Sequence, residues 1–165
     1  MTSRVAPAIM LIASLGVALV DTLAAETQVL RQDLKLSPEL LKLLRAEMGE
    51  IAGGVQGIAL SLAIADWGSI QETSEKIRAS YIMEKKLTPA QAEELERVLP
   101  EHFKELDSEF HQKAEKLGQA AAVHDPELIV FHYYRLIESC VPCHATYARS
   151  RFPGFAAAKQ RNPGH

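Results

Sequence analysis

The two cysteines of this 165-residue sequence lie close together near its C-terminus, in the segment Cys140-Val141-Pro142-Cys143-His144. The pattern C-x-x-C-H is the attachment signature of a c-type haem. Two thiols at this spacing can add across the two vinyl groups of one haem, and the histidine that follows is then placed beneath the iron as an axial ligand. We therefore predict one covalently bound haem c per chain, with thioether bonds from Cys140 and Cys143 and with His144 as the proximal iron ligand.

Three other interpretations of the motif explain less of it. A thioredoxin-like dithiol is expected beside a βαβ pattern, and no strand-like alternation precedes Cys140. A zinc site needs four ligands, and the sequence has no second Cys/His pair at a suitable spacing. A disulfide between Cys140 and Cys143 is a further alternative, but it leaves His144 without a role. The haem interpretation accounts for all three side chains.

Residues 1–25 have the features of a secretory signal peptide. Arg4 supplies a positive charge, and an apolar run from Val5 to Val20 follows it. Ala24 and Ala25 provide small side chains for cleavage, and the apolar run is shorter than the ~20 residues that a membrane span needs. We expect cleavage and export to the bacterial periplasm, where c-type haem is normally attached. An uncleaved segment would instead anchor the protein to a membrane.

Composition indicates a single helical domain after the signal. Leucine and alanine are abundant and only 6% of the residues are aromatic, which favours an all-α fold over a β-rich one. The net charge of −3 gives no reason to expect nucleic acid as a partner. We divide the chain into the signal peptide (1–25), a lead-in (26–36), a four-helix-bundle domain (37–152) and an irregular tail (153–165).

Capping residues and apolar spacing predict four long helices in the domain. Ser37 and Pro38 begin the first helix as its N-cap and first helical residue. Apolar residues then recur at alternating steps of four and three, which is typical of a helix packed nearly antiparallel to its neighbours. This seam comprises Leu44, Met48, Ile51, Val55, Ile58 and Leu62.

The remaining helices are predicted from the same kinds of signal. An S-x-x-E capping box at Ser69–Glu72 begins the second helix, and a Thr-Pro pair at Thr88 begins a short connecting one. The third runs from Pro100 to Gly118 or Ala122, and the last from Asp125 to Tyr147 or Arg149. We expect a kink or a restart of the last helix at Pro142, because proline does not fit a helix interior. The predicted fold is an antiparallel four-helix bundle.

A haem motif near the end of the last of four helices resembles the class II c-type cytochromes, the cytochrome c′ family. The resemblance covers about Ser37 to Phe152. It implies that a residue of the first helix faces the open side of the iron: an apolar, non-ligating residue in high-spin members and a methionine in low-spin members. Met48 lies about where that residue falls, so the resemblance implies a low-spin, His/Met-ligated member with Met48 as the distal iron ligand. The order Tyr147-Ala148-Arg149 departs from the aromatic-Arg pair that often follows the haem histidine in the family.

These features predict an electron carrier rather than an enzyme. No combination of acid, base and nucleophile is evident, whereas a haem held by His144 and Met48 changes oxidation state with both ligands in place. The expected partners are exported or membrane-bound redox proteins, and the first-helix seam permits a homodimer. The alternative is a five-coordinate, cytochrome c′-like protein that binds nitric oxide or carbon monoxide. A peroxidase is a weaker alternative, because it would want a polar acid/base near the iron.

Overall fold

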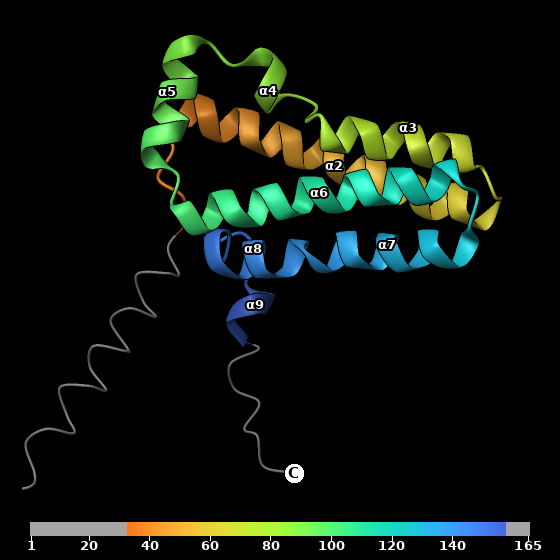
Figure 1. Ribbon diagram of the computed structural model, residues 1–165. Helices are drawn as coiled ribbons and strands as arrows, with labels where there is room; N and C mark the ends of the chain where they lie inside the picture. The colour runs from red at the N-terminus through yellow and green to blue at the C-terminus, as the bar shows by residue number, and fades with distance from the viewer. Residues whose placement is uncertain (1–32, 158–165) are drawn as a thin grey trace, which may run out of the picture.

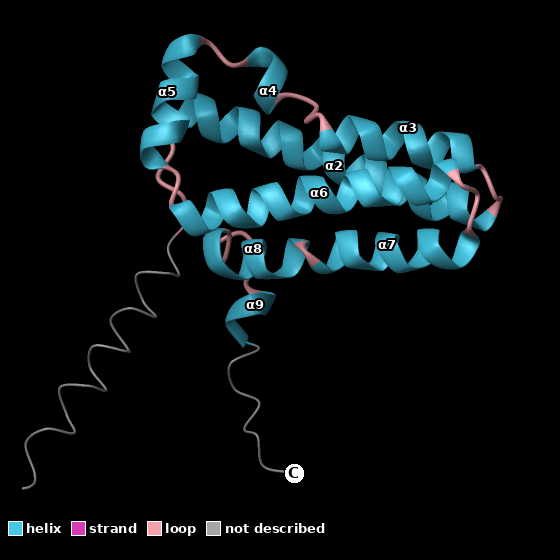
Figure 2. Ribbon diagram, in the orientation of Figure 1, coloured by secondary structure: helices cyan, strands magenta, loops and turns pink. Residues whose placement is uncertain are grey.

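The computed structural model describes residues 33–157, so the predicted signal peptide (1–25), most of the lead-in and residues 158–165 of the tail lie outside the described residues. Within the described part every regular element is a helix, which confirms the predicted all-α class (Figure 1, Figure 2). No helix of this part is both long enough and apolar enough to cross a membrane. The helices are α2 (Pro38–Ala63), α3 (Trp67–Arg78), α4 (Met83–Lys86), α5 (Pro89–Val98), α6 (Glu101–Ala122), α7 (Pro126–Glu138), α8 (Cys140–Tyr147) and α9 (Gly154–Ala157).

Four of these helices lie side by side and alternate in direction. α3 packs against both α2 and α6, and α7 packs against α6 and touches α2 (Figure 1). α8 continues the course of α7 along the first half of α6, while α4 and α5 connect α3 to α6 at the end of the molecule where α2 and α6 begin. The segment 140–147 therefore lies at that same end.

Three of the predicted helix starts are confirmed. The Ser37 hydroxyl oxygen accepts a hydrogen bond from Leu40 N at 3.4 Å, with Pro38 in the first turn of α2. Thr88 and Gln91 form the reciprocal capping box of α5, and a carboxylate oxygen of Asp125 accepts from Leu128 N at 3.0 Å to begin α7. In each case the cap satisfies a backbone N–H that has no partner within the helix.

The predicted start of the second helix is wrong. α3 begins at Trp67 rather than Ser69, because Asp66 is its N-cap. The Asp66 carboxylate accepts from Ser69 N at 3.1 Å and from the Ser69 hydroxyl at 2.6 Å. Ser69 therefore serves as a donor inside the first turn, and Asp66 supplies the oxygen that caps the helix.

The last long helix is interrupted before the haem motif rather than at its proline. α7 ends at Glu138, and α8 restarts at Cys140. Pro142 consequently lies in the first turn of α8, where a residue without an N–H leaves no helical hydrogen bond unmade. The tail also differs from the prediction, since Gly154–Ala157 forms the short helix α9.

Leu40, Phe103 and Tyr147 are buried at the end of the molecule that contains α8, but the main buried cluster lies farther along α6 and α7. It is formed by the second half of α2, by α3, by the second half of α6 and by α7. Its fully buried members are Ile58, Ile70, Ile77, Ala114, Leu117, Ala120, Ala121, Ile129 and Leu136. At the other end the predicted seam is less well covered: Leu44 is half-buried, and Met48 is 38% exposed.

Two adjacent glycines of α2 provide a matched test of this packing. A Cβ atom at Gly54 would lie 2.8 Å from the hydroxyl oxygen of Tyr81 and 3.1 Å from Cγ2 of Thr73, whereas one at Gly53 would have no atom within 4 Å. We expect Gly54→Ala to lower the free energy of unfolding by ~1–3 kcal/mol through overpacking. Gly53→Ala is expected to raise it by ~0.5–1 kcal/mol, because alanine favours the helix. Denaturant unfolding measures both, and equal effects of the two changes would contradict the packing.

Candidate functional site

The three chemically reactive side chains of the motif share one turn of α8. Cys140, Cys143 and His144 are related by three and four positions and therefore lie on one helix face. All three are half-buried, and both thiols are free. The restart of the helix at Cys140 thus places both sulfurs and the imidazole on a single rigid element.

His144 is held as a neutral imidazole. Its ring stacks on that of Phe152, with centroids 4.7 Å apart and an angle of 26° between the planes. Burial lowers the pKa of His144 below its ordinary value of 6.5. A neutral ring keeps one nitrogen lone pair free, which is the form in which histidine binds a metal.

Burial shifts the pKa of the two thiols in the opposite direction, which keeps them protonated and neutral. Burial raises the pKa of Cys140. It also raises the pKa of Cys143, which with the added influence of Asp107 and of Cys140 reaches about 11. Because the thiolate is the nucleophilic form, the folded chain shields these sulfurs from reaction at neutral pH.

This shielding can be measured in protein made without haem attachment. At pH 8 we expect iodoacetamide to alkylate Cys143 at least ~10-fold more slowly in the folded Cys140→Ala variant than in the same chain in urea, because burial and Asp107 still raise the pKa of Cys143 when Cys140 is absent. As pH rises, the Cys143 thiol loses its proton at a lower pH in the unfolded chain than in the folded chain. The stability contributed by the neutral thiol is therefore complete below pH 9 and lost between pH 9.0 and about 11. Equal alkylation rates would contradict the burial.

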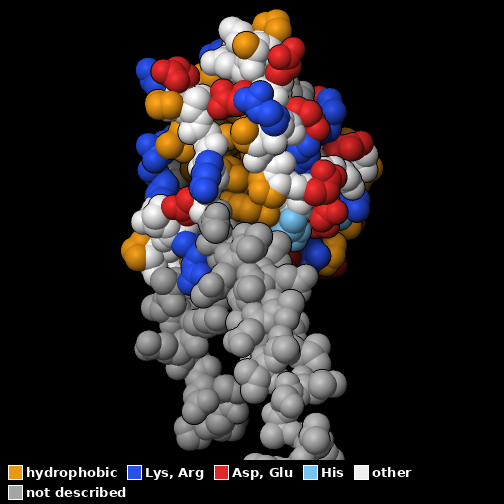
Figure 3. Space-filling model, turned by 90° about the vertical axis from the view of Figure 1, so that its left-hand side faces the viewer, with side chains coloured by type: hydrophobic (Ala, Val, Ile, Leu, Met, Phe, Trp, Pro, Cys, Tyr) orange, Lys and Arg blue, Asp and Glu red, His pale blue; other side chains and the backbone are white. Residues whose placement is uncertain are grey.

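The surroundings of the motif are apolar but incompletely covered. Figure 3 views this end of the molecule and shows hydrophobic side chains gathered between Lys, Arg, Asp and Glu side chains. Leu40 of α2 and Phe103 of α6 are buried at this end, but many of the other apolar residues of α2, α5 and α6 here are only half-buried. They include Leu41, Leu44, Leu95, Val98 and Leu106. The two thiols and the neutral imidazole are suitable groups to hold a haem. The apolar surface around them fits a flat, mostly apolar porphyrin.

Met48, the predicted distal ligand, lies at the edge of this region. Its side chain is 38% exposed, whereas that of the preceding residue, Glu47, is 3% exposed. At this level of α2 the carboxylate therefore faces the interior more directly than the thioether does. The seam predicted from apolar spacing passes through Met48 and leaves out Glu47, so the predicted inner position at this turn of α2 is wrong.

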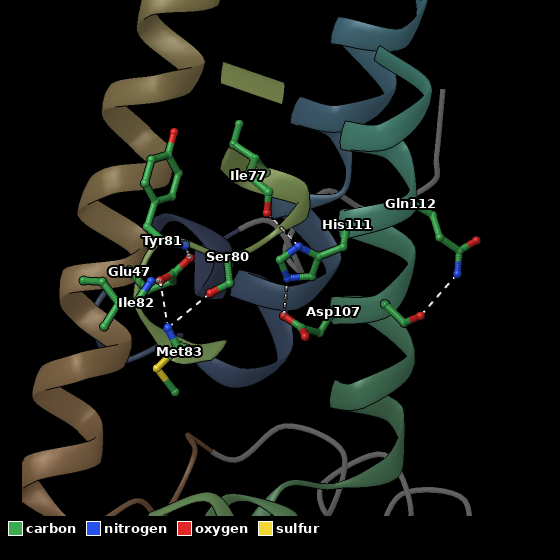
Figure 4. A network of polar contacts seen from close by, with 10 residues as sticks. Glu47, Ile77, Ser80, Tyr81, Ile82, Met83, Asp107, His111 and Gln112 are labelled. Carbon is green, nitrogen blue, oxygen red and sulfur yellow. Dashed lines mark hydrogen bonds and ion pairs between the residues drawn. The ribbon is translucent and has the colours of Figure 1, made fainter. Parts of the chain in front are cut away.

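Glu47 is the residue near the site that sequence reasoning missed. One of its carboxylate oxygens accepts a hydrogen bond from Tyr81 N at 2.8 Å, and the other accepts from Ile82 N at 2.5 Å and Met83 N at 3.2 Å (Figure 4). Met83 N also donates to the Ser80 hydroxyl oxygen at 3.1 Å. The carboxylate therefore attaches α2 to the segment between α3 and α4. An alternative choice of seam, with Glu47 between Leu44 and Ile51, keeps the same four–three spacing and could have revealed it.

A second polar link joins α3 to α6. Nδ1 of His111 lies 2.8 Å from the carbonyl oxygen of Ile77, and its Nε2 lies 3.7 Å from an oxygen of Asp107 (Figure 4). His111 thus takes part in packing at the end of α3.

Comparisons of the chain with protein-family models, with curated proteins and with solved structures found no significant match. Within residues 33–157, no three His, Cys, Asp or Glu side chains come together in a group that could hold a metal ion.

Proposed function

We propose that the protein is a class II-like c-type cytochrome that carries one electron between exported or membrane-bound redox proteins. The observation that carries this proposal is the placement of Cys140, Cys143 and His144 on one turn of α8, beside apolar side chains that are only half-buried. The alternating directions of α2, α3, α6 and α7 support an antiparallel four-helix bundle, which is the architecture that the resemblance implies (Figure 1).

The residues of the site have different roles in the proposed haem binding. When bound, the haem supplies iron that can be oxidised and reduced by one electron. The sulfurs of Cys140 and Cys143 anchor the porphyrin to α8, and the neutral ring of His144 gives its lone pair to the metal. Half-buried leucines of α2, α5 and α6 exclude water, which disfavours the oxidised charge and raises the reduction potential. Met48 provides a thioether for the distal side.

Gas binding is the second candidate, and the exposure of Met48 favours it. A side chain that is 38% exposed could cover the iron without binding it, which would leave a position open for nitric oxide or carbon monoxide. Catalysis of the peroxidase type is less well supported. Glu47, the buried carboxylate nearest to Met48 in sequence, already accepts three backbone hydrogen bonds, which occupies the lone pairs that an acid or base would use.

The optical spectrum of the purified full chain tests both candidates. We expect low-spin bands and a weak far-red sulfur-to-iron transition in the wild type. Met48→Ala is expected to abolish that transition and to produce a high-spin spectrum that changes on addition of carbon monoxide, because the distal position is then open. Leu60→Ala, which removes a side chain that is 66% exposed on the same helix, is the control and should leave the spectrum unchanged. A wild-type spectrum that is already high-spin and responds to carbon monoxide would favour gas binding over electron transfer.

The proposal also concerns the cellular location of the protein and its partners. The signal-like segment 1–25 supports export to the periplasm, and an uncleaved segment would tether the domain to a membrane. The partners are redox proteins that approach the haem edge, and a homodimer is compatible with this arrangement.

A further inference from the structure

The hydroxyl group of Tyr147 is buried without a hydrogen-bond partner. Tyr147 lies in the last turn of α8, and its side chain is among the buried members of the fold at 7% exposure. Its oxygen has less than 1 Å² of accessible surface, and no donor or acceptor within residues 33–157 is in position to pair with it. Burial of an unpaired hydroxyl is unfavourable, because the group gives up its hydrogen bonds to water and gains none in return.

Two other hydroxyl groups of the fold have a hydrogen-bond partner or can reach one locally. The hydroxyl of Tyr133 on α7 donates to the carbonyl oxygen of Val55 at 3.0 Å. The Ser74 hydroxyl, which is also unpaired, lies inside α3 on a short side chain that can rotate toward the carbonyl one turn earlier. The Tyr147 oxygen is at the end of a rigid ring and has no such local choice.

The ring of Tyr147 is held firmly beside the haem motif. It packs edge-on against Phe103 of α6, with centroids 5.3 Å apart, and lies 6.3 Å from the ring of His102. It follows Cys143 by four positions and His144 by three, so that all three share one face of α8. Burial, Cys143 and Glu105 raise the pKa of Tyr147 above 10.0. The hydroxyl therefore keeps its proton and is available as a donor.

We infer that the Tyr147 hydroxyl donates a hydrogen bond to a propionate carboxylate of the bound haem and so helps to position the porphyrin. This inference rests on the proposed function, since it requires a haem on Cys140 and Cys143. The propionates are the strongest hydrogen-bond acceptors that a haem carries, and a hydrogen bond to a charged acceptor is stronger than one between neutral groups. Tyr147 acts through the porphyrin's carboxylate and is not a ligand of the iron.

The test compares wild-type haem-loaded protein with Tyr147→Phe, which removes one oxygen and keeps the ring that packs on Phe103. We expect the propionate bending band of the resonance Raman spectrum to shift to lower frequency. We also expect the ratio of reduced to oxidised protein at the wild-type midpoint to fall roughly threefold, because an unpaired carboxylate favours the oxidised iron more strongly. The ligand-sensitive absorption bands should not change, since His144 still binds. Exchange of the solvent into D₂O should shift the propionate band of the wild type. The same exchange should leave the propionate band of Tyr147→Phe unshifted, because that variant has no hydroxyl proton to exchange.

Two further variants separate this inference from its alternatives. Tyr134→Phe, which removes a hydroxyl from a side chain that is 59% exposed, should match the wild type in both measurements. If Glu105→Gln reproduces the effects of Tyr147→Phe, the hydroxyl pairs with that carboxylate and the inference is overturned. An unchanged propionate band and midpoint in Tyr147→Phe would overturn it as well, while leaving the proposed electron carrier intact. Wild-type protein that carries no haem would overturn the proposed function itself.

Discussion

Replacement of Cys140 and Cys143 together by alanine is expected to abolish haem attachment completely. When the full chain is produced beside a haem-attachment system, the wild type should be red and heavier than its polypeptide by one haem. The double variant should be colourless and should have the mass of the polypeptide alone, because these are the two cysteines of the sequence and no other side chain can form the thioether bonds. Mass spectrometry under denaturing conditions measures the difference directly. A wild type without added mass would contradict the central proposal.

His144→Ala separates attachment from ligation in the same experiment. The thiols remain, so the variant should still carry covalent haem, but the iron should lose its proximal imidazole and show an altered spectrum. Its matched control is His124→Ala, which changes a histidine at the exposed turn between α6 and α7 and should retain the wild-type spectrum. If His144→Ala and His124→Ala give the same spectrum as the wild type, His144 does not bind the iron.

Helix starts could be predicted from the sequence where a single short-range hydrogen bond decides them. Ser37, Thr88 and Asp125 each precede a proline and cap the helix that follows, so the local residues contain the whole signal. The start of α3 could not be predicted in this way. Asp66 and Ser69 both have side chains that can cap a helix, and the local residues do not decide between them. In the structure the Ser69 hydroxyl donates to the Asp66 carboxylate, and Asp66 caps α3.

The inner face of α2 shows why spacing alone does not decide burial. The seam through Leu44, Met48 and Ile51 and the seam through Leu44, Glu47 and Ile51 follow the same pattern of three and four. Hydrophobicity favours Met48, but the structure buries Glu47 because the segment 81–83 presents three backbone N–H groups to it. Such a tertiary partner, 34 to 36 residues away, leaves no mark in the local sequence. The C-x-x-C-H motif, in contrast, is contiguous, and the haem prediction depends on its five residues alone.

The buried carboxylate of Glu47 gives the largest expected loss of stability. Its oxygens accept hydrogen bonds from Tyr81 N, Ile82 N and Met83 N, and the side chain is 3% exposed. Glu47→Ala would leave Tyr81 N and Ile82 N without a partner in a site that water reaches poorly, and each unpaired group costs about 1–3 kcal/mol. Met83 N would keep its hydrogen bond to the Ser80 hydroxyl oxygen. We expect the free energy of unfolding to fall by ~3–5 kcal/mol, a large part of the stability of a domain of this size.

Two comparisons identify the hydrogen bonds as the cause of that loss. Glu47→Gln keeps one acceptor oxygen but turns an amide donor toward a backbone donor, so we expect an intermediate loss of ~1–3 kcal/mol. Glu50→Ala, at an exposed position of the same helix, should change stability by no more than ~0.5 kcal/mol. Urea unfolding of the three variants measures this order. If Glu47→Ala is no less stable than Glu50→Ala, the segment between α3 and α4 is not attached through Glu47. If the expected order is found, the carboxylate fixes the point at which the chain leaves α3 for α4 and α5, and with it the cover over the end of the molecule that contains the haem motif.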